Sequence, residues 1–292
     1  MSDLPGTVAS HAASADEQRR KRLLYERNLK QRSIAIAATS TAIVVTLVVV
    51  LVPMTPGWYK VRRSFFNGDV FGDTFPGLIS AFVKDIQIFA WCAPCIVIWG
   101  MILAVCRSVR TPALFPLRMF AAAYTDIFRG VPVILTILLI GFGVPGLGLP
   151  RPWNSPYIWG SVALVLAYSS YVAEVFRAGI DSVHESQRAA SRSLGLSSSQ
   201  TMRFVVLPQA VRRVVPPLMN DFISLQKDVA LVSLIGPIEV LRQAGIDKSK
   251  YANFTPYVGA AIIFLLLTIP ETRFVDHLMA RERRRTSGTT VR

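Results

Sequence analysis

Residues 86–106 read IQIFAWCAPCIVIWGMILAVC, and none of these 21 side chains is charged. A helix rises about 1.5 Å per residue, so a helix of this length crosses the roughly 30 Å hydrocarbon layer of a bilayer. Because lipid offers the backbone no hydrogen-bond partners, a crossing segment of this kind has to be helical. The stretch therefore predicts a transmembrane helix.

Five other stretches of the chain are apolar over similar lengths. One of them, 214–237, differs from the rest because it contains Asp221, Lys227 and Asp228. Together with 86–106 these runs predict an all-α polytopic membrane protein with six transmembrane helices. The five runs are 34–52, 130–150, 156–173, 214–237 and 254–270.

The composition agrees with a membrane protein. Apolar residues make up 52% of the 292 residues and charged residues 17%, against about 25% charged residues in a typical soluble domain. These values exclude a disordered chain and argue against a water-soluble globule. The net charge of +14 does not indicate nucleic-acid binding, because the basic residues lie in short blocks between the apolar runs. Three cysteines cannot build a disulfide framework.

Lys and Arg are distributed unevenly between the two sides of the predicted membrane region. If the N-terminus is cytosolic, the inside segments hold 22 of the 32 basic residues and the outside segments hold seven. Cytosolic loops carry such an excess, so we predict that both termini lie on the cytosolic side of the membrane. The inside segments are 1–33, 107–118, 177–213 and 273–292, and the outside segments are 53–77, 144–156 and 236–253.

The predicted cytosolic loop at 177–213 has the signals of two helices separated by a glycine. Residues 183–194 contain no Gly or Pro, and Gly195 can end a helix in the left-handed conformation. Ser197 followed by Gln200 forms a capping box that starts a second helix, which Pro208 should end or kink. The alternative is a solvated surface hairpin without a function.

Sites for chemistry on the chain itself are not indicated. The sequence has no G-x-x-x-x-G-K-[ST] loop for ATP and no H-E-x-x-H, and its three histidines are scattered. Cys92 and Cys95 have redox-motif spacing but lie inside an apolar run, which favours plain packing. We therefore expect no enzyme, no metal site and no cofactor in this chain.

Ionisable residues inside predicted membrane helices are costly, so they usually face a cavity or a partner. Asp221 and Asp228 lie two helical turns apart and share a face, with Asn220 and Lys227 on the adjoining stripe. These four residues predict a polar substrate path or a gate. The alternative is a structural Lys–Asp pair that fixes helix packing.

Several segments resemble one family of membrane proteins. Ala189-Ala190-Ser191, Gly195 and then 205–208 (VVLP) resemble the EAA–G–I-LP motif of ABC-importer permease subunits, with matching spacing. The segments FRGVP, YVAEVFRAGI and FISLQKDVALVSLIG resemble FRGTP, AEIFRAGI and FISLLKDTSLVSVIG of its polar amino-acid (His/Gln/Glu-type) branch. They start at Phe128, Tyr171 and Phe222 and lie within a region of likeness at about 78–275.

The resemblance implies a five-helix type I importer core at 78–275, to which 34–52 adds an extra N-terminal anchor. It also implies a second permease subunit, identical or related, and an external binding protein. A cytosolic ABC ATPase dimer would bind ATP and Mg and dock on a coupling helix at about 183–196. The motif glutamate is Ala189 here, so its role would be missing or supplied by Glu185 or another residue. The residues implied in coupling are Glu185, Gln187, Arg188, Ala189, Ala190, Ser191, Leu194, Gly195, Leu196, Leu207 and Pro208.

The remaining segments are a basic tail at 1–33, an external loop at 53–77 and a second basic tail at 276–292. The basic tails could bind anionic membrane lipid. Two alternatives to an importer subunit stay open. Asp221, Lys227 and Asp228 also suit a stand-alone ion-coupled secondary transporter, although the sequence lacks the internal repeat of many such carriers. A membrane scaffold that moves no solute is the other.

Overall fold

The computed structural model describes residues 5–108 and 111–287, which form two compact units, Met1–Arg63 and Ser64–Arg292. Within the described ranges every regular element is a helix and none is a strand, so the predicted all-α class is confirmed. The ends of both predicted tails, 1–4 and 288–292, and the predicted inside residue Arg110 lie outside the described residues.

The first unit consists mainly of one long helix, α1 (Pro5–Leu51). Most of the basic tail and the predicted anchor therefore form one continuous helix of 47 residues, about 70 Å long. Between Thr7 and Val52 the sequence has neither Gly nor Pro, so nothing interrupts the backbone hydrogen bonds. The part Asn28–Leu51 is apolar enough to cross a membrane.

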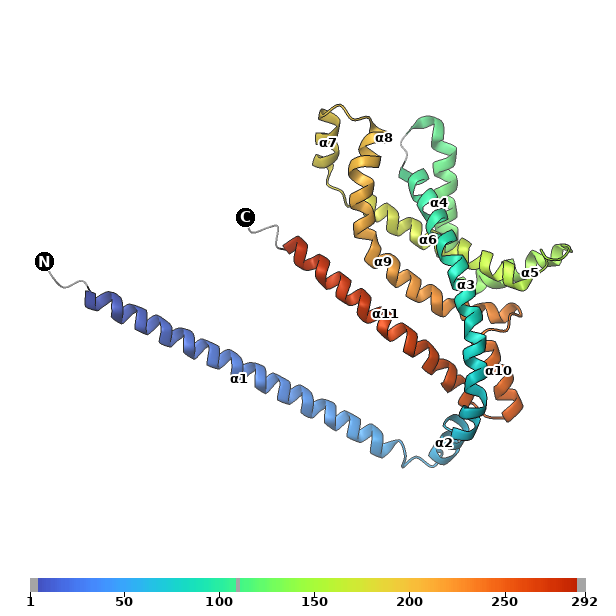
Figure 1. Ribbon diagram of the computed structural model, residues 1–292, viewed down its shortest axis with the longest axis horizontal. Helices are drawn as coiled ribbons and strands as arrows, with labels where there is room; N and C mark the ends of the chain where they lie inside the picture. Colours follow the sequence, from blue (N-terminus) through green and yellow to red (C-terminus); the bar gives the residue numbers. More distant parts are fainter. Residues whose placement is uncertain (1–4, 109–110, 288–292) are drawn as a thin grey trace. The chain divides into compact units, whose positions relative to one another are not determined.

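The second unit carries the remaining helices, whose order along the chain is shown in Figure 1. Helix α2 (Trp58–Phe65) precedes it at the boundary of the two units. The elements that follow are α3 (Gly68–Ser108), η1 (Pro112–Leu114), α4 (Phe115–Gly130), α5 (Val133–Gly143), η2 (Pro145–Leu147), α6 (Pro156–Asp181), α7 (Glu185–Ser193), α8 (Ser198–Thr201), the π-helical turn η3 (Met202–Val206), α9 (Leu207–Asp228), the 3-10 segment η4 (Val229–Ile235), α10 (Val240–Tyr251) and α11 (Thr255–Ser287).

Helix α6 is the centre of this unit. It packs against α3, α4, α5 and α9, and most of its buried residues are Gly, Ala or Ser. Small residues let helix backbones approach closely, which is how helices associate in a membrane. A Cβ added at Gly160 would lie 2.4 Å from Val232 Cγ1, and one added at Gly179 would lie 2.2 Å from Val214 Cγ1. Both glycines therefore sit where no larger residue fits.

The predicted number of six spans is reached only by counting bent elements. Four helical stretches are long and apolar enough to cross a membrane, and two bent pairs each add one more if they are counted as a single crossing. The bends measure 106° and 53°. The four stretches are Asn28–Leu51, Trp58–Ser108, Pro156–Asp181 and Thr255–Arg281, and the pairs are Pro112–Gly130 with Val133–Leu147 and Ser198–Ile235 with Val240–Tyr251.

The run at 130–150, predicted as one transmembrane helix, is not one continuous helix. The chain breaks at Val131, which is extended because it precedes Pro132, and α5 has only 11 residues, about 16 Å. Only α4 and α5 taken together, with the 106° bend between them, are long and apolar enough for one crossing. An apolar run without charge signals burial in lipid or core, but it does not reveal a break inside it.

Two further boundaries differ from expectation. The helix predicted at 214–237 begins earlier, at Leu207, and its α-helical part ends at Asp228. The 3-10 segment η4 follows, and Gly236 after it has a φ of +122°. Pro208 does not end the helix, because the π-helical turn η3 directly before it changes the hydrogen-bond register. Helix α3 starts within the predicted loop at 53–77, where the side chain of Asn67 accepts from the backbone N–H of Asp69 and Val70.

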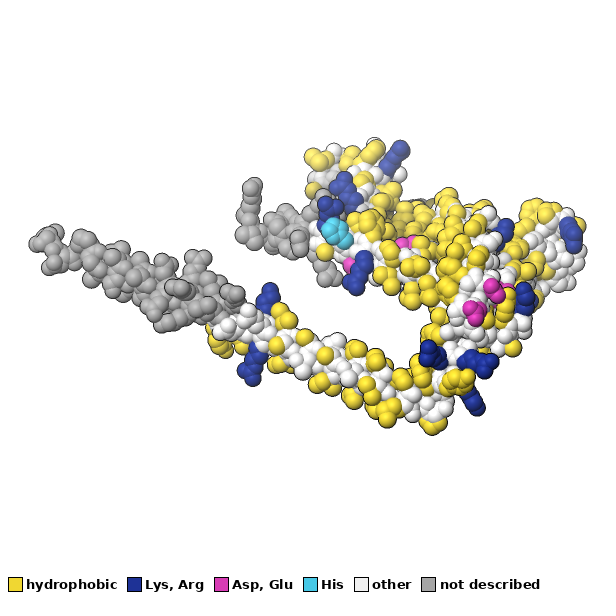
Figure 2. Space-filling model, turned by 60° about the horizontal axis from the view of Figure 1, so that its bottom comes forward, with side chains coloured by type: hydrophobic (Ala, Val, Ile, Leu, Met, Phe, Trp, Pro, Cys, Tyr) yellow, Lys and Arg dark blue, Asp and Glu magenta, His cyan; other side chains and the backbone are white. Residues whose placement is uncertain are grey.

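Apolar side chains cover the outside of the second unit as well as its core. Figure 2 shows hydrophobic side chains over most of its visible face, with Lys and Arg mainly toward the edges. A single chain in water would not expose such an area, whereas a helix bundle in lipid does. The polar Ser side chains of α6 are satisfied within the helix, as when Ser170 Oγ donates to the Ala167 carbonyl at 2.6 Å.

The close approach of α6 to α9 gives a testable prediction. Gly179→Ala should destabilise the protein by about 1–3 kcal/mol, because the added Cβ overlaps Val214. Gly77→Ala, on α3 with no atom within 4 Å of the added Cβ, is the matched control and should be neutral. Apparent melting temperatures of the full chain in detergent measure both, and Val214→Ala should rescue Gly179→Ala. Equal melting temperatures of the two single variants would contradict this packing.

Candidate functional site

The loop between α6 and α9 contains the short helix α7 (Glu185–Ser193), which lies with α8 at one end of the second unit (Figure 1). The predicted helix at 183–194 is thus confirmed with slightly tighter bounds. It starts at Glu185 because His184 caps it, with Nδ1 accepting from the Ser186 backbone N–H at 3.2 Å. Val183 lies before the helix, and its side chain is buried.

Gly195 ends α7 as predicted, with a φ of +84°. The backbone N–H of Leu196 donates to the Ser191 carbonyl at 3.2 Å, and that of Gly195 donates to the Arg192 carbonyl at 2.9 Å. These two bonds form a Schellman motif, which satisfies carbonyls that the helix end would otherwise leave unpaired. Only a residue that tolerates positive φ can occupy position 195 without strain.

The second helix starts with the predicted capping box. Ser197 Oγ accepts from the Gln200 N–H at 3.2 Å, and the Ser197 N–H donates to Gln200 Oε1 at 2.8 Å. The hydroxyls of Ser191 and Thr201 lie 2.9 Å apart and join α7 to α8. The loop is therefore a helix–glycine–helix hairpin with defined contacts.

Two arginines bind the C-terminal end of α6, one from the hairpin and one from α9. Arg188 of α7 donates to the Ile180 carbonyl at the end of α6, and Arg213 of α9 donates to the Ser182 carbonyl and, at 3.0 Å, to Ser182 Oγ. A small apolar cluster lies beneath these bonds. It consists of Ile180, Val183, Val206 and Ala210, with Met202 packed against it. These contacts hold the start of the hairpin and α9 against the end of α6.

The residues implied in coupling divide into an outer and an inner set. Ser191 is buried, and Arg188, Leu196 and Leu207 are partly buried, so these residues hold the hairpin together. The outer set is available to a partner, and Leu194 stands out with 84% of its surface exposed. The outer set is Glu185, Gln187, Ala189, Ala190, Leu194, Gly195 and Pro208.

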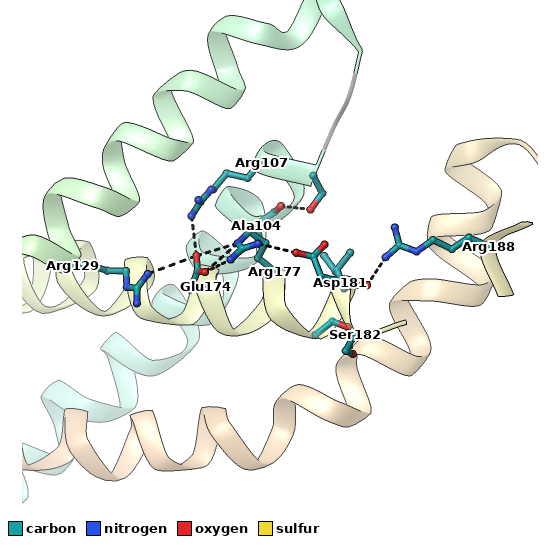
Figure 3. A network of polar contacts seen from close by, with 11 residues as sticks. Ala104, Arg107, Arg129, Glu174, Arg177, Asp181, Ser182 and Arg188 are labelled. Atoms are coloured by element: carbon teal, nitrogen blue, oxygen red, sulfur yellow. Dashed lines mark hydrogen bonds and ion pairs between the residues drawn. The ribbon is translucent and has the colours of Figure 1, made fainter. Parts of the chain in front are cut away.

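A cluster of charges fixes the same end of α6, and Figure 3 shows it from close by. Glu174 accepts from Arg107 of α3 at 3.0 Å and from the Nε and Nη2 groups of Arg177, and it lies 3.8 Å from Arg129 of α4. Arg177 also pairs with Asp181 at 2.8 Å. From the sequence alone only the Glu174–Arg177 pair is expected, because these residues lie three positions apart on one helix face. The cluster joins the FRGVP and AEVFRAGI segments in space.

The four candidate path residues do not form the expected ion pairs. In the described part of the chain no salt bridge joins Lys227 to an aspartate, and Asn220 and Lys227 are exposed on α9. Asp228 accepts from the Tyr168 hydroxyl of α6 at 2.8 Å, while Asp221 is partly buried and its Oδ2 has no hydrogen-bond partner. The alternative of a structural Lys–Asp pair is therefore not present among the described residues.

Sequence reasoning missed a polar contact between α9 and α11. With its amide nitrogen facing α11, Gln226 donates to Glu271 Oε2 at 2.7 Å. Both residues line a cavity of about 110 Å³ between these helices, together with Phe222 and Phe274. Glu271 lies one position after Pro270, at the end of an apolar run. Its charge at that place was the only sign in the sequence of a polar contact. Among the described residues, no group of three His, Cys, Asp or Glu is placed to hold a metal ion.

Comparisons with known proteins agree with this arrangement. Residues 74–284 match the family described as the inner membrane component of binding-protein-dependent transport systems. This match covers more than half of the chain, so the chain belongs to that family. It is a transport subunit and a multi-pass protein of a bacterial inner membrane, and the predicted family is confirmed.

Curated relatives are named as amino-acid permeases. The chain is 35% identical over 184 residues to the probable glutamine ABC transporter permease protein GlnM of Bacillus subtilis, which covers 62% of this chain and 84% of that protein. It is 34% identical over 172 residues to a putative glutamine transport system permease protein GlnP of Rickettsia conorii, which covers 58% and 76%. Both matches support the amino-acid branch of the family.

Solved structures share the fold. The crystal structure of an amino acid ABC transporter with histidines superposes with a TM-score of 0.64 at 32% identity, covering 70% of this chain and 94% of that one. The inward-facing MetNI methionine ABC transporter gives a TM-score of 0.55 at 20% identity, covering 69% and 95%, and shows a likeness of fold alone.

The Schellman motif of the hairpin gives a second prediction. At position 195 a substitution meets no atom within 4 Å, so only the positive φ opposes it. Gly195→Val should therefore cost about 1–3 kcal/mol locally, while Gly195→Asn should cost less because Asn tolerates the left-handed region. Hydrogen exchange of the amides at 185–201 measures this, with Val faster than Asn and Asn near the wild type. Equal rates for Val and Asn would contradict the assigned conformation.

Proposed function

We propose that this chain is the permease subunit of an ATP-driven ABC importer for polar amino acids. The observation that carries the proposal is the rigid α7–Gly195–α8 hairpin between two long helices, in a chain whose relatives are named as glutamine and amino-acid permeases. Glutamine and chemically similar amino acids are the first substrates to test.

Energy for transport enters through a partner in this proposal. A cytosolic ABC ATPase dimer, which holds ATP and Mg, docks on the outer face of α7. Ala189 and Ala190 are small and exposed, so a partner surface can approach the helix backbone closely, and Leu194 supplies an apolar anchor at the tip. Glu185 is the exposed acidic residue nearest to the motif position occupied by Ala189.

A second permease subunit, identical or related, completes the path. Asn220 and Lys227 are exposed on a helix that belongs in the membrane, and exposed polar groups there need a partner or a water-filled cavity. Asp221 and Asp228 lie beside them on α9 and form the inner wall of the same path. An external binding protein delivers the substrate, which fits the name of the family.

The orientation follows from the charges. With both termini in the cytosol, the segments on the inside hold 22 basic residues and those on the outside seven. The hairpin with α7 is then cytosolic, and α10 lies on the outer side. The basic tails also contact anionic lipid of the inner leaflet, and nucleic acid is not a partner.

Reconstitution tests the proposal. Liposomes that contain this chain, its ATPase and its binding protein should take up labelled glutamine only when ATP is present, and a panel of amino acids ranks the substrates. A binding protein omitted from otherwise identical liposomes is the control, and uptake should then be lost. Uptake by this chain alone, driven by a proton or sodium gradient without ATP, would instead establish the stand-alone carrier.

A further inference from the structure

Two carboxyl side chains are completely buried where α3 meets the start of α10. Asp85 of α3 is 1% exposed and Glu239, the residue before α10, is 0% exposed. They are 154 positions apart in the sequence and are brought together by the packing of α10 on α3. Neither belongs to the hairpin or to the path residues on α9.

Both carboxyls bind the N-terminal end of α10. Glu239 accepts from the backbone N–H groups of Leu241 at 2.8 Å and of Arg242 at 2.7 Å, and Asp85 Oδ2 accepts from the Val240 N–H at 3.2 Å. Asp85 therefore binds the N–H of the residue directly after Glu239, so both carboxyls lie at the same buried helix end. The remaining oxygen, Asp85 Oδ1, is buried and has no hydrogen-bond partner.

Positive charge around the pair is insufficient for two ionised carboxylates. Lys84 points away to Gln87 and is exposed, and the Arg242 side chain is exposed, so neither forms an ion pair with the two carboxyls in the described part of the chain. The end of α10 itself supplies about half a unit charge. Burying two neighbouring anions against that partial charge would be far too costly.

Other charged residues on the neighbouring elements do not change this balance. On α10, Asp247 accepts from the Gln243 amide at 3.1 Å, and Lys248 lies over the Phe254 ring. The parts of η4 and α11 that pack here, 229–238 and 255–270, contain no charged residue. The nearest charges beyond them are Asp228 and Glu271.

We propose that Asp85 and Glu239 form a proton-binding site that holds one proton between them. The proton supplies the donor that Asp85 Oδ1 lacks and reduces the pair to a single negative charge, which the N-terminal N–H groups of α10 stabilise. Proton binding therefore fastens α10 to α3. When the proton is lost, two like charges at the same helix end push the start of α10 away from α3.

The sign of the pH dependence follows from proton counting. In the unfolded chain both carboxyls ionise near pH 4, whereas the folded chain keeps one proton above that pH. The folded state therefore binds more protons, and its stability falls as the pH rises. The site is independent of the proposed transport function, because it concerns the packing of α10 in the isolated chain.

Thermal unfolding of the full chain in detergent, from about pH 6 to about pH 9, tests the site. The wild type should lose about 5 °C or more of apparent melting temperature toward alkaline pH, relative to Asp85→Asn. In Asp85→Asn the amide donates to Glu239 without a proton, so its melting temperature should not share this loss. Asp247→Asn, a buried carboxyl on the same helix with an amide partner, is the matched control and should keep the wild-type pH dependence.

Infrared difference spectroscopy on the same samples gives a second readout that does not depend on stability. A protonated-carboxyl band should be present in the wild type and in Asp247→Asn at neutral pH, and absent in Asp85→Asn and in Glu239→Gln. Identical pH profiles of the wild type and Asp85→Asn, or a band unchanged in both Asp85→Asn and Glu239→Gln, would overturn the proposal. So would stabilisation of the wild type by sodium or calcium ions in place of protons, because the pair would then be a cation site.

Discussion

The close approach of α6 to the helices around it is the constraint on which the second unit depends. Gly160 and Gly179 leave room only for a hydrogen where Val232 and Val214 pack against them, and the serines of α6 satisfy their hydroxyls within the helix. In lipid no hydrophobic effect drives helices together, so this fit of small residues is what places α3, α4, α5 and α9. The location of every residue of functional interest depends on how these helices pack around α6.

The C-terminal end of α6 is connected to α7 by a short segment that side-chain contacts hold in place. Glu174 forms salt bridges with Arg107 of α3 and Arg129 of α4. It also pairs with Arg177, three residues further along α6. Arg188 of the hairpin then donates to the Ile180 carbonyl, and Arg213 of α9 donates to the Ser182 carbonyl. The proposed importer, driven by a separate ATPase, requires such a stiff element, because packed helices transmit a displacement by rigid-body movement.

Local signals in the sequence predicted the local features well. The start of α6 at Pro156, the left-handed Gly195 and the capping box of Ser197 all follow from residues a few positions apart. The sequence did not predict the break at Val131–Pro132, because the apolar run continues across it and a single proline was the only sign of a break. The partners of Glu174 and the meeting of Asp85 with Glu239 depend on contacts across 45 to 154 positions, which one sequence without its fold does not reveal.

We propose that an ATPase acts on this chain through α7. A crosslink between the tip of α7 and the ATPase is the most direct test. A photo-crosslinking amino acid at Leu194, which is 84% exposed, is compared with one at Leu147 of η2, which is 76% exposed. In the assembled transporter the account predicts a crosslink from position 194 to the ATPase and none from position 147. Crosslinks to the ATPase from 147, or none from 194 in a complex that transports, would contradict it.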